Sequence, residues 1–160
     1  MDLERVPKVG QKAPDFELPD DMGCNVRLSD VVREGIVLLL FYPADFGMIC
    51  SLQMGEFRDR YQDFEAAGVR ILPVSTNSVR SHGAWRESMR LPFSLLADED
   101  GKVTGLYHMD CDDEAWLKNR SCRGAFVVDR EMNVLYRWIP PYPHQGPDVP
   151  ALLREVRSVT

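Results

Sequence analysis

One uninterrupted apolar run, residues 36–42, constrains the fold of this chain more than any other feature. The run reads Ile-Val-Leu-Leu-Leu-Phe-Tyr, offers no polar face to water, and ends at Pro43. Such a pattern is typical of a strand that is buried on both faces, as the central strands of an α/β sheet are. It is too short for a bilayer, which takes about 20 residues to cross. A second run at residues 69–74 predicts another buried strand.

The remaining segments alternate between helical and strand patterns, with turns where glycine, proline and aspartate gather. In chain order we expect a hairpin over residues 14–28, a helical turn at 29–30, the strand 36–42, a loop at 43–49, a helix from about 50 to 67 ended by Gly68, the strand 69–74, a helix over 77–89 capped by Thr76 or Asn77, a strand at 93–96, a helix at 103–109, a hairpin of 125–128 with 134–138, a proline-rich loop from 140, and a helix at 149–156.

Early parallel crossovers followed by a late hairpin predict an α/β, thioredoxin-like sandwich. It would have a mixed central β-sheet, flanking helices and an N-terminal β-hairpin. The chain of 160 residues has the length of a single domain, which we place over residues 1–160.

Charge and composition narrow the partners and the location. The chain has 19 basic and 25 acidic residues, a net charge of −6, and no basic run, so nucleic-acid binding is not expected. The first residues, Met1 to Arg5, are charged and lack the apolar core of a secretory signal. We therefore expect a cytoplasmic protein with no membrane partner.

The four cysteines, Cys24, Cys50, Cys111 and Cys122, are irregularly spaced, and no two form a Cys-x-x-Cys pair. The three histidines are scattered too, so a zinc site is not expected, and no other metal or cofactor is indicated. In a reducing cytosol such cysteines are more often buried apolar residues or reactive thiols than structural disulfides.

Cys50 lies where a helix start would favour its thiolate. It follows a buried strand and a proline-bounded loop, and an amphipathic helical pattern begins there. The first N–H groups of a helix have no intrahelical partner and carry partial positive charge, which stabilises an anion. A nearby guanidinium would stabilise it further, and Arg123, at the mouth of a predicted central strand, is the candidate. The alternative is that Cys50 is a small apolar residue at a helix start.

An ordered set of motifs resembles one known family. Residues 41–50, Phe-Tyr-Pro-Ala-Asp-Phe-Gly-Met-Ile-Cys, are similar to the active-site loop of the peroxiredoxins, the thioredoxin-fold thiol peroxidases. The family's pattern is proline, three residues, threonine or serine, two residues, cysteine. Pro43 and Cys50 match this pattern, and Gly47 occupies the hydroxyl position. Similar blocks follow in the family's order at residues 75–85, 92–98, 105–107 and 123–129, and the resemblance spans roughly residues 7–157.

The resemblance implies a thiol peroxidase that reduces hydrogen peroxide or organic hydroperoxides through a Cys50 sulfenic acid. Cys50 would be the peroxidatic nucleophile, Arg123 would stabilise the thiolate and the peroxide, and Pro43 would shield the site from solvent. Gln53 stands where the family often has glutamate or glutamine. Gly47 removes a hydroxyl that holds the peroxide, and losing one such donor can cost on the order of 10² to 10³ in rate. The alternative function is a weakly active peroxide sensor or redox interaction protein on the same scaffold.

The resolving step is less well defined. Some relatives carry a second cysteine five residues after the first, but that position here is Gly55. Cys111, expected to be exposed, is the best internal candidate for a resolving cysteine. It ranks ahead of Cys122, which would point away from the site, and of Cys24, near a hairpin turn. The alternative for all three is a structural or adventitious thiol. We therefore predict a one-cysteine enzyme that is reduced by an external thiol: a thioredoxin-like protein, a glutaredoxin-like protein or a low-molecular-weight thiol.

Aromatic residues near the predicted site suggest self-association. Tyr42, Phe46, Trp85 and the loop at 138–142 offer apolar surface, so we expect a homodimer or a higher homo-oligomer.

Two polar residues near the predicted site have other interpretations. His82 is interpreted as a hydrogen-bonded helix histidine. Asp45 would oppose ionisation of the thiol unless a basic partner such as Arg123 offsets it.

Overall fold

The structure, a computed structural model, describes residues 1–111, 117–142 and 144–160. In this part of the chain a two-stranded sheet, β1-β2, accompanies a five-stranded sheet in the order β5-β4-β3-β6-β7. The strands are β1 (Glu17–Pro19), β2 (Asn25–Arg27), β3 (Ile36–Phe41), β4 (Val69–Ser75), β5 (Leu96–Ala97), β6 (Gly124–Val128) and β7 (Val134–Trp138). The helices are α1 (Leu28–Val31), the 3₁₀ turn η1 (Val32–Glu34), α2 (Met48–Asp59), α3 (Tyr61–Ala66), α4 (Val79–Met89), α5 (Lys102–Leu106) and α6 (Val149–Val159).

The five-stranded sheet is mixed. β3 and β5 both run parallel to β4, whereas β6 runs antiparallel to β3 and to β7. The strands β1 and β2 form the predicted N-terminal hairpin, with Leu18 opposite Val26. The prediction of an α/β sandwich with a mixed central sheet, flanking helices and an N-terminal hairpin is therefore confirmed.

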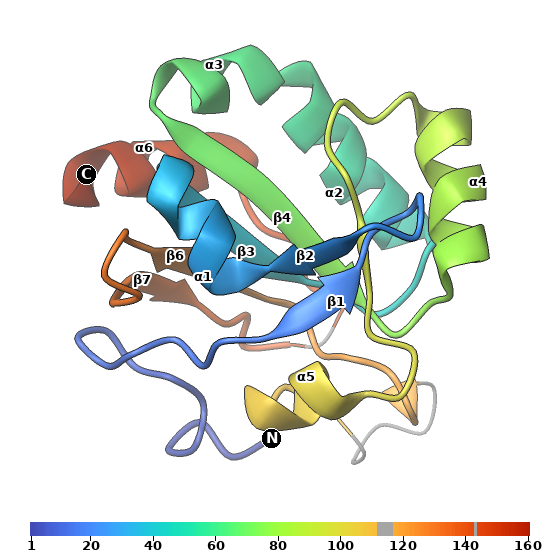
Figure 1. Cartoon of the computed structure of the whole chain (residues 1–160), viewed down its shortest axis with the longest axis horizontal. Coiled ribbons are helices and arrows are strands. Elements are labelled where there is room, and N and C mark those ends of the chain that lie inside the picture. The colour runs from blue at the N-terminus through green and yellow to red at the C-terminus, as the bar shows by residue number, and fades with distance from the viewer. Residues whose placement is uncertain (112–116, 143) are drawn as a thin grey trace.

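The central strand β3 is buried on both faces, as its apolar run predicts. Val37, Leu39 and Phe41 belong to a cluster on one side of the sheet, and Leu38 and Leu40 belong to a second cluster on the other. This alternation follows from the two-residue repeat of a strand. Figure 1 shows α1 and the β1-β2 pair in front of the sheet, with α5 below β1.

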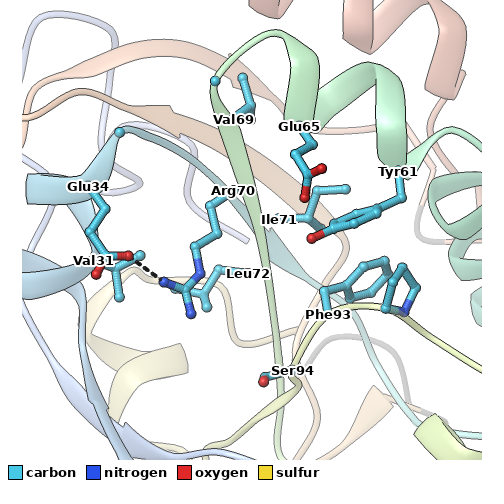
Figure 2. Close-up of a pocket in the computed structure, with 13 residues that line it drawn as sticks. Val31, Glu34, Tyr61, Glu65, Val69, Arg70, Ile71, Leu72, Phe93 and Ser94 are labelled. Carbon is cyan, nitrogen blue, oxygen red and sulfur yellow. Dashed lines mark hydrogen bonds and ion pairs between the residues drawn. The ribbon is translucent and has the colours of Figure 1, made fainter.

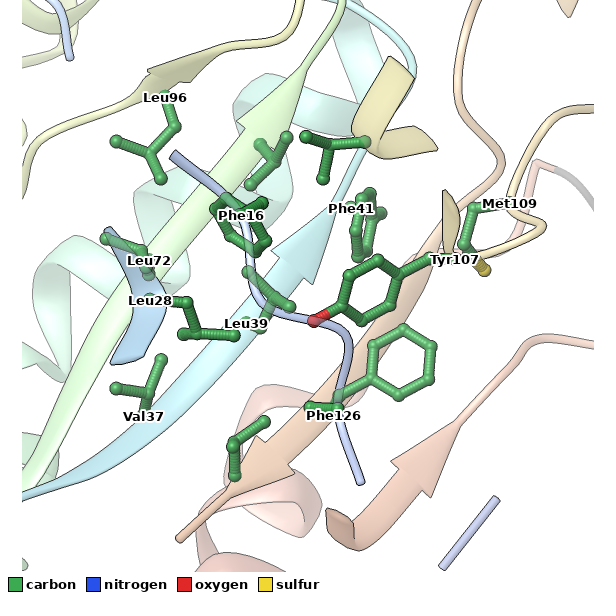
Figure 3. Close-up of a cluster of buried hydrophobic side chains, with 14 of the residues drawn as sticks. Phe16, Leu28, Val37, Leu39, Phe41, Leu72, Leu96, Tyr107, Met109 and Phe126 are labelled. Atoms are coloured by element: carbon green, nitrogen blue, oxygen red, sulfur yellow. The ribbon is translucent and has the colours of Figure 1, made fainter. Parts of the chain in front are cut away.

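The first cluster is built around an aromatic group. Tyr107 lies next to Phe41 and Phe126, with ring centroids 5.1 and 5.5 Å apart, and Phe16 packs against it from the N-terminal segment (Figure 3). The Tyr107 hydroxyl donates to the carbonyl oxygen of Pro14 at 2.6 Å. These contacts hold the N-terminal segment on this face of the sheet. The opposite face is covered by α2, α3, α4 and α6.

The helix predicted from residue 50 to residue 67 is two helices. The chain leaves helical geometry at Arg60, with φ −107° and ψ 11°, and α3 begins at the next residue. Phe57 of α2 and Phe64 of α3 still pack together, with ring centroids 5.6 Å apart. The apolar spacing that predicts one helix is therefore satisfied by two. Gly68 follows with a φ of 74°, as predicted for a glycine that ends a helix.

Other boundaries differ more locally. α4 is capped by Ser78 rather than Thr76 or Asn77, because the Ser78 hydroxyl accepts from the N–H of Ser81 at 3.0 Å. β5 is shorter and later than predicted, and α5 ends three residues early, before His108 adopts a φ of 55°.

Candidate active site

The loop after β3 leads directly into α2, and Cys50 lies in the first turn of that helix. Gly47 is the N-cap residue and Met48 the first helical residue. Cys50 is 2% exposed and packs in the second apolar cluster. The structure thus places Cys50 where the sequence predicts, at a helix start whose free N–H groups and partial positive charge favour a thiolate.

Arg123 lies against the sulfur. Its Nη1 donates to Cys50 Sγ at 3.0 Å and lies 3.4 Å from Gln53 Oε1, and the residue is only 3% exposed. The sheet register explains this meeting. Gly124 at the start of β6 pairs with Phe41 at the end of β3, so the residue before β6 lies beside the loop that follows β3. A guanidinium in this position stabilises a sulfur anion and can also bind an oxygen that gains negative charge.

Two loop residues flank the thiol. Pro43 is buried directly after β3. Gly47 has φ −66° and ψ 144°, angles that any residue adopts. A Cβ added at Gly47 would lie 3.5 Å from the carbonyl oxygen of Ala44 and 3.7 Å from Cys50 Sγ, both ordinary contact distances. The backbone at Gly47 therefore does not require glycine, and a side chain there would lie beside the sulfur.

A buried polar network centred on Asp45 holds the loop between β3 and α2. Asp45 Oδ2 lies 2.7 Å from Nδ1 of His82 on α4, and Asp45 Oδ1 accepts from the Tyr42 hydroxyl at 2.7 Å. The hydroxyl of Ser81 also donates to Asp45 Oδ2, at 2.8 Å, and Asn77 Oδ1 accepts from the N–H of Asp45 at 2.9 Å. The side chains of Asp45 and His82 have no exposed surface. These hydrogen bonds therefore replace the ones that both groups would form with water.

Both ring nitrogens of His82 have a partner in this network. Its Nε2 lies 2.9 Å from the carbonyl oxygen of Leu96, while its Nδ1 faces the Asp45 carboxylate. His82 is therefore held by a hydrogen bond at each ring nitrogen, one to Asp45 and one to the backbone of Leu96. The basic side chain that the structure places against Asp45 is His82, at 2.7 Å, whereas Arg123 is placed against Cys50. Burial, and after it the charge of Asp45, raises the pKa of Tyr42 well above its usual range, which keeps this hydroxyl a neutral donor.

The other cysteines lie apart from Cys50. Cys111 and Cys122 are joined by a disulfide, with Cα atoms 5.4 Å apart, and both are buried. The expectations of unpaired cysteines and of an exposed Cys111 are therefore wrong. Cys122 belongs to the cluster on the opposite side of the sheet from Cys50, in agreement with its predicted orientation. Cys24 is free and exposed beside the β1-β2 turn.

The expected aromatic surface is only partly exposed. Tyr42 and Trp85 are buried and contribute to the core, so their assignment to a surface is wrong. Three exposed apolar residues, Phe46, Met48 and Leu52, lie at the start of α2, and we call them the apolar rim. Tyr142, in the loop at 138–142, is exposed as well.

A separate cavity of about 380 Å³ lies at the other end of the sheet, beside α3 and the start of β4. Figure 2 shows Tyr61 and Glu65 of α3 around it, with Arg70 of β4 paired to Glu34 at 2.9 Å. None of its lining residues belongs to the Cys50 site, so this cavity is separate from that thiol.

Within residues 1–111, 117–142 and 144–160, no three side chains of His, Cys, Asp or Glu come together in a way that could hold a metal ion. Over the same ranges, no helix has both the length and the apolar character of a membrane span.

The fold and the site together define a thiol-based redox protein, because a mixed α/β sheet presents one buried thiol at a helix start with an arginine on its sulfur. The AhpC/TSA family matches residues 9–137. Peroxiredoxin 2 of Thermoplasma acidophilum is 34% identical over 158 residues, which cover 94% of this chain and 75% of that protein. Peroxiredoxin Bcp of Bacillus subtilis is 33% identical over 139 residues, which cover 82% of this chain and 84% of that one.

A solved structure extends the comparison to the fold. The crystal structure of peroxidoxin BcpB from Mycobacterium tuberculosis matches 96% of this chain and 99% of its own length, with a TM-score of 0.86 and 28% identity. The chain therefore belongs to the AhpC/TSA family, and the predicted peroxiredoxin resemblance and thioredoxin-like fold are confirmed. The peroxiredoxin names of these relatives support thiol peroxidase activity in general.

Proposed function

We propose that this chain is a thiol peroxidase that reduces hydrogen peroxide or organic hydroperoxides at Cys50. The observation that carries the proposal is the Nη1 of Arg123, which lies 3.0 Å from Cys50 Sγ in a site almost closed to water. The thiolate attacks the distal peroxide oxygen and the O–O bond breaks. The sulfur keeps one oxygen as a sulfenic acid, and the other oxygen takes up a proton and leaves as water or an alcohol.

The surrounding residues have distinct roles in this reaction. Arg123 holds Cys50 as a thiolate and stabilises the charge that develops on the peroxide oxygens. Pro43 keeps bulk water away from the thiolate and the sulfenic acid. The free N–H groups of the first turn of α2 add donors on the same side. Gly47 contributes no side-chain donor, which separates this site from the family's usual pattern.

An external thiol completes the cycle. The thiol attacks the sulfenic sulfur, water leaves, and a mixed disulfide forms; a second thiol then releases the Cys50 thiolate. The bond between Cys111 and Cys122 supports this one-cysteine route, because in that state neither has a thiol to offer Cys50. The reductant would be thioredoxin-like, glutaredoxin-like or a low-molecular-weight thiol. The proposed location is the cytoplasm, which cell fractionation tests.

The apolar rim supports a homodimer. All three of its members, Phe46, Met48 and Leu52, are more than half exposed, at 58%, 82% and 67%. An exposed apolar patch of this kind indicates a protein–protein contact, which we assign to a second copy of this chain. Light scattering should give more than the 18.3 kDa of one chain, and Leu52→Glu should return the mass to that value. A mass of one chain for the unsubstituted protein would refute the dimer.

The proposed activity is tested by single-turnover stopped-flow oxidation with hydrogen peroxide. Cys50→Ser should abolish peroxide consumption, because a hydroxyl is neither ionised nor comparably nucleophilic. Arg123→Met should lower both the thiolate fraction at neutral pH, read by absorbance, and the rate, by about 10². Cys24→Ser and Arg120→Met, which remove the same side chains from exposed positions, are the matched controls. Full activity of the Cys50 variant would sink the assignment.

Gly47 favours one alternative, a peroxide sensor or redox interaction protein that reacts slowly. A peroxidase should react with peroxide orders of magnitude faster than free cysteine, whereas a sensor need not turn over. A rate for Cys50 close to that of free cysteine would favour the sensor.

A further inference from the structure

A second pair of sulfurs lies close to Arg123 in the chain but away from Cys50 in space. Cys111 and Cys122 are bonded to each other and are 5% and 3% exposed. They pack in the apolar cluster on one face of the sheet, whereas Cys50 packs in the cluster on the other face. The pair is therefore a redox couple separate from the peroxide-reacting thiol.

This disulfide cross-links two chain segments that already meet. The N–H of Cys122 donates to the carbonyl oxygen of Met109 at 2.7 Å, and Asp110 forms an antiparallel bridge with Ser121. These contacts lie outside the regular strands. The S–S bond adds a covalent link to these backbone contacts at Cys122.

The residues on both sides of Arg123 in the chain are restrained. On one side is Cys122, held by the disulfide, and on the other is Gly124, which begins β6 and pairs with Phe41. From this position the guanidinium reaches Cys50 Sγ at 3.0 Å. A charge-assisted hydrogen bond of this kind weakens steeply when its distance or angle changes. If the backbone at Cys122 becomes more mobile, the next residue, Arg123, can shift, and its hydrogen bond to Cys50 Sγ weakens.

We propose that the Cys111–Cys122 disulfide is a second redox centre that positions Arg123 against Cys50, so that the reactivity of Cys50 depends on the oxidation state of this pair. The inference rests on the proposed role of Cys50. Reduction by a dithiol breaks the S–S bond, transfers two electrons and two protons to the pair, and leaves the dithiol as its own disulfide. Reformation uses one hydroperoxide: two thiols become the disulfide, and water and an alcohol (or a second water) leave.

The burial of the pair separates it from a resolving role. A resolving cysteine must bond to Cys50, which requires the two sulfurs to meet from opposite faces of the sheet. A positioning disulfide needs no such contact, and it stays intact through turnover because exchange requires local opening of buried sulfurs.

The experiment compares the same protein in two states. One sample is fully reduced with a phosphine, and the other is oxidised and then treated briefly with a monothiol to restore only Cys50. Peptide mass mapping establishes the state of the pair in each sample. Cys50 is then followed by alkylation with iodoacetamide at pH 7 and by single-turnover oxidation with hydrogen peroxide. The variant Cys111→Ala, Cys122→Ala is carried through both treatments, with Cys24→Ser as the matched control.

With the disulfide intact, Cys50 should be alkylated and oxidised about three- to tenfold faster. The double variant should be slow after either treatment, and Cys24→Ser should keep the difference between the two states. Equal alkylation rates in both states would overturn the proposal, as would a mapped bond from Cys50 to Cys111 or Cys122. Alkylation needs no peroxide, so a chain that shows the alkylation difference but fails to consume peroxide would refute the proposed peroxidase and leave the positioning role standing.

Discussion

Gly47→Thr tests whether the missing hydroxyl at position 47 slows the reaction of Cys50 with peroxide. Gly47 is the N-cap of α2, with φ −66° and ψ 144°, and the nearest atom beyond its chain neighbours would be 3.5 Å from an added Cβ. Threonine adopts these angles without strain. The substitution therefore adds a hydroxyl beside Cys50 Sγ at little steric cost.

The structure gives a separate magnitude for stability and for rate. A threonine N-cap adds a few tenths of a kcal/mol over glycine, and loss of glycine's freedom in the unfolded chain adds about 0.4–1 kcal/mol, so the free energy of unfolding should rise by about 1 kcal/mol. For a chain of this length that raises Tm by about 2–4 °C. The rate of Cys50 oxidation should rise about tenfold or more, because the hydroxyl binds and orients the peroxide in the transition state.

Stopped-flow oxidation of Cys50 and thermal unfolding measure the two effects, and Gly47→Val is the matched control. Valine has threonine's shape without the hydroxyl, so it should share much of the gain in Tm but none of the gain in rate. If the valine variant were as fast as the threonine variant, the gain would come from a stiffer loop. If threonine brought no gain at all, a donor already present in the site would be doing the work of the hydroxyl.

Three further predictions concern the supports of the site. His82→Leu removes the ring nitrogen that lies 2.7 Å from Asp45 Oδ2 and leaves that buried carboxyl group short of a partner, so urea titration should show a loss of about 1–3 kcal/mol in unfolding free energy. Adding Asp45→Asn should cost clearly less than the sum of the single changes, and simple additivity would contradict the pairing. Burial raises the pKa of Tyr42 and Tyr107 above the usual range, so the stability that depends on their neutral forms is complete below about pH 10 and falls above it by about 1.4 kcal/mol per pH unit for each tyrosine. Tyr107→Phe should make that alkaline decline shallower, and an unchanged slope in urea titrations would assign it to other groups. Reduction of the buried disulfide, which spans a sequence separation of 11, should lower the unfolding free energy by about 3 kcal/mol, and an unchanged urea midpoint would show that the bond does not restrain the unfolded chain.

The parts of the fold that were predictable from sequence are those specified by local patterns. The apolar run at 36–42 has to be shielded from water on both faces. In the structure it forms the buried strand β3. Cys50 could be placed because a strand, a proline and a helical pattern adjoin it directly. Arg123 could be placed because the residue before a central strand lies at the end of the sheet where the loop after β3 begins. Periodicity was less informative at Arg60, since apolar spacing is the same for one helix and for two that share a face.

The restraints on the site come from segments distant in sequence, and no local pattern predicts them. Asp45 and His82 are 37 residues apart, and their pairing depends on how α4 docks onto the sheet. Cys111 is expected from the sequence to be exposed, yet it is buried and bonded to Cys122. Strand alternation indicated correctly that Cys122 turns away from the site, but its partner is set by a junction outside any regular strand. In the proposed mechanism the chemistry belongs to Cys50 and Arg123, and the supports of the site are α4, through His82, and the disulfide junction beside Arg123. This division explains how the site can lack a hydroxyl at position 47 and still hold Cys50 in a defined place.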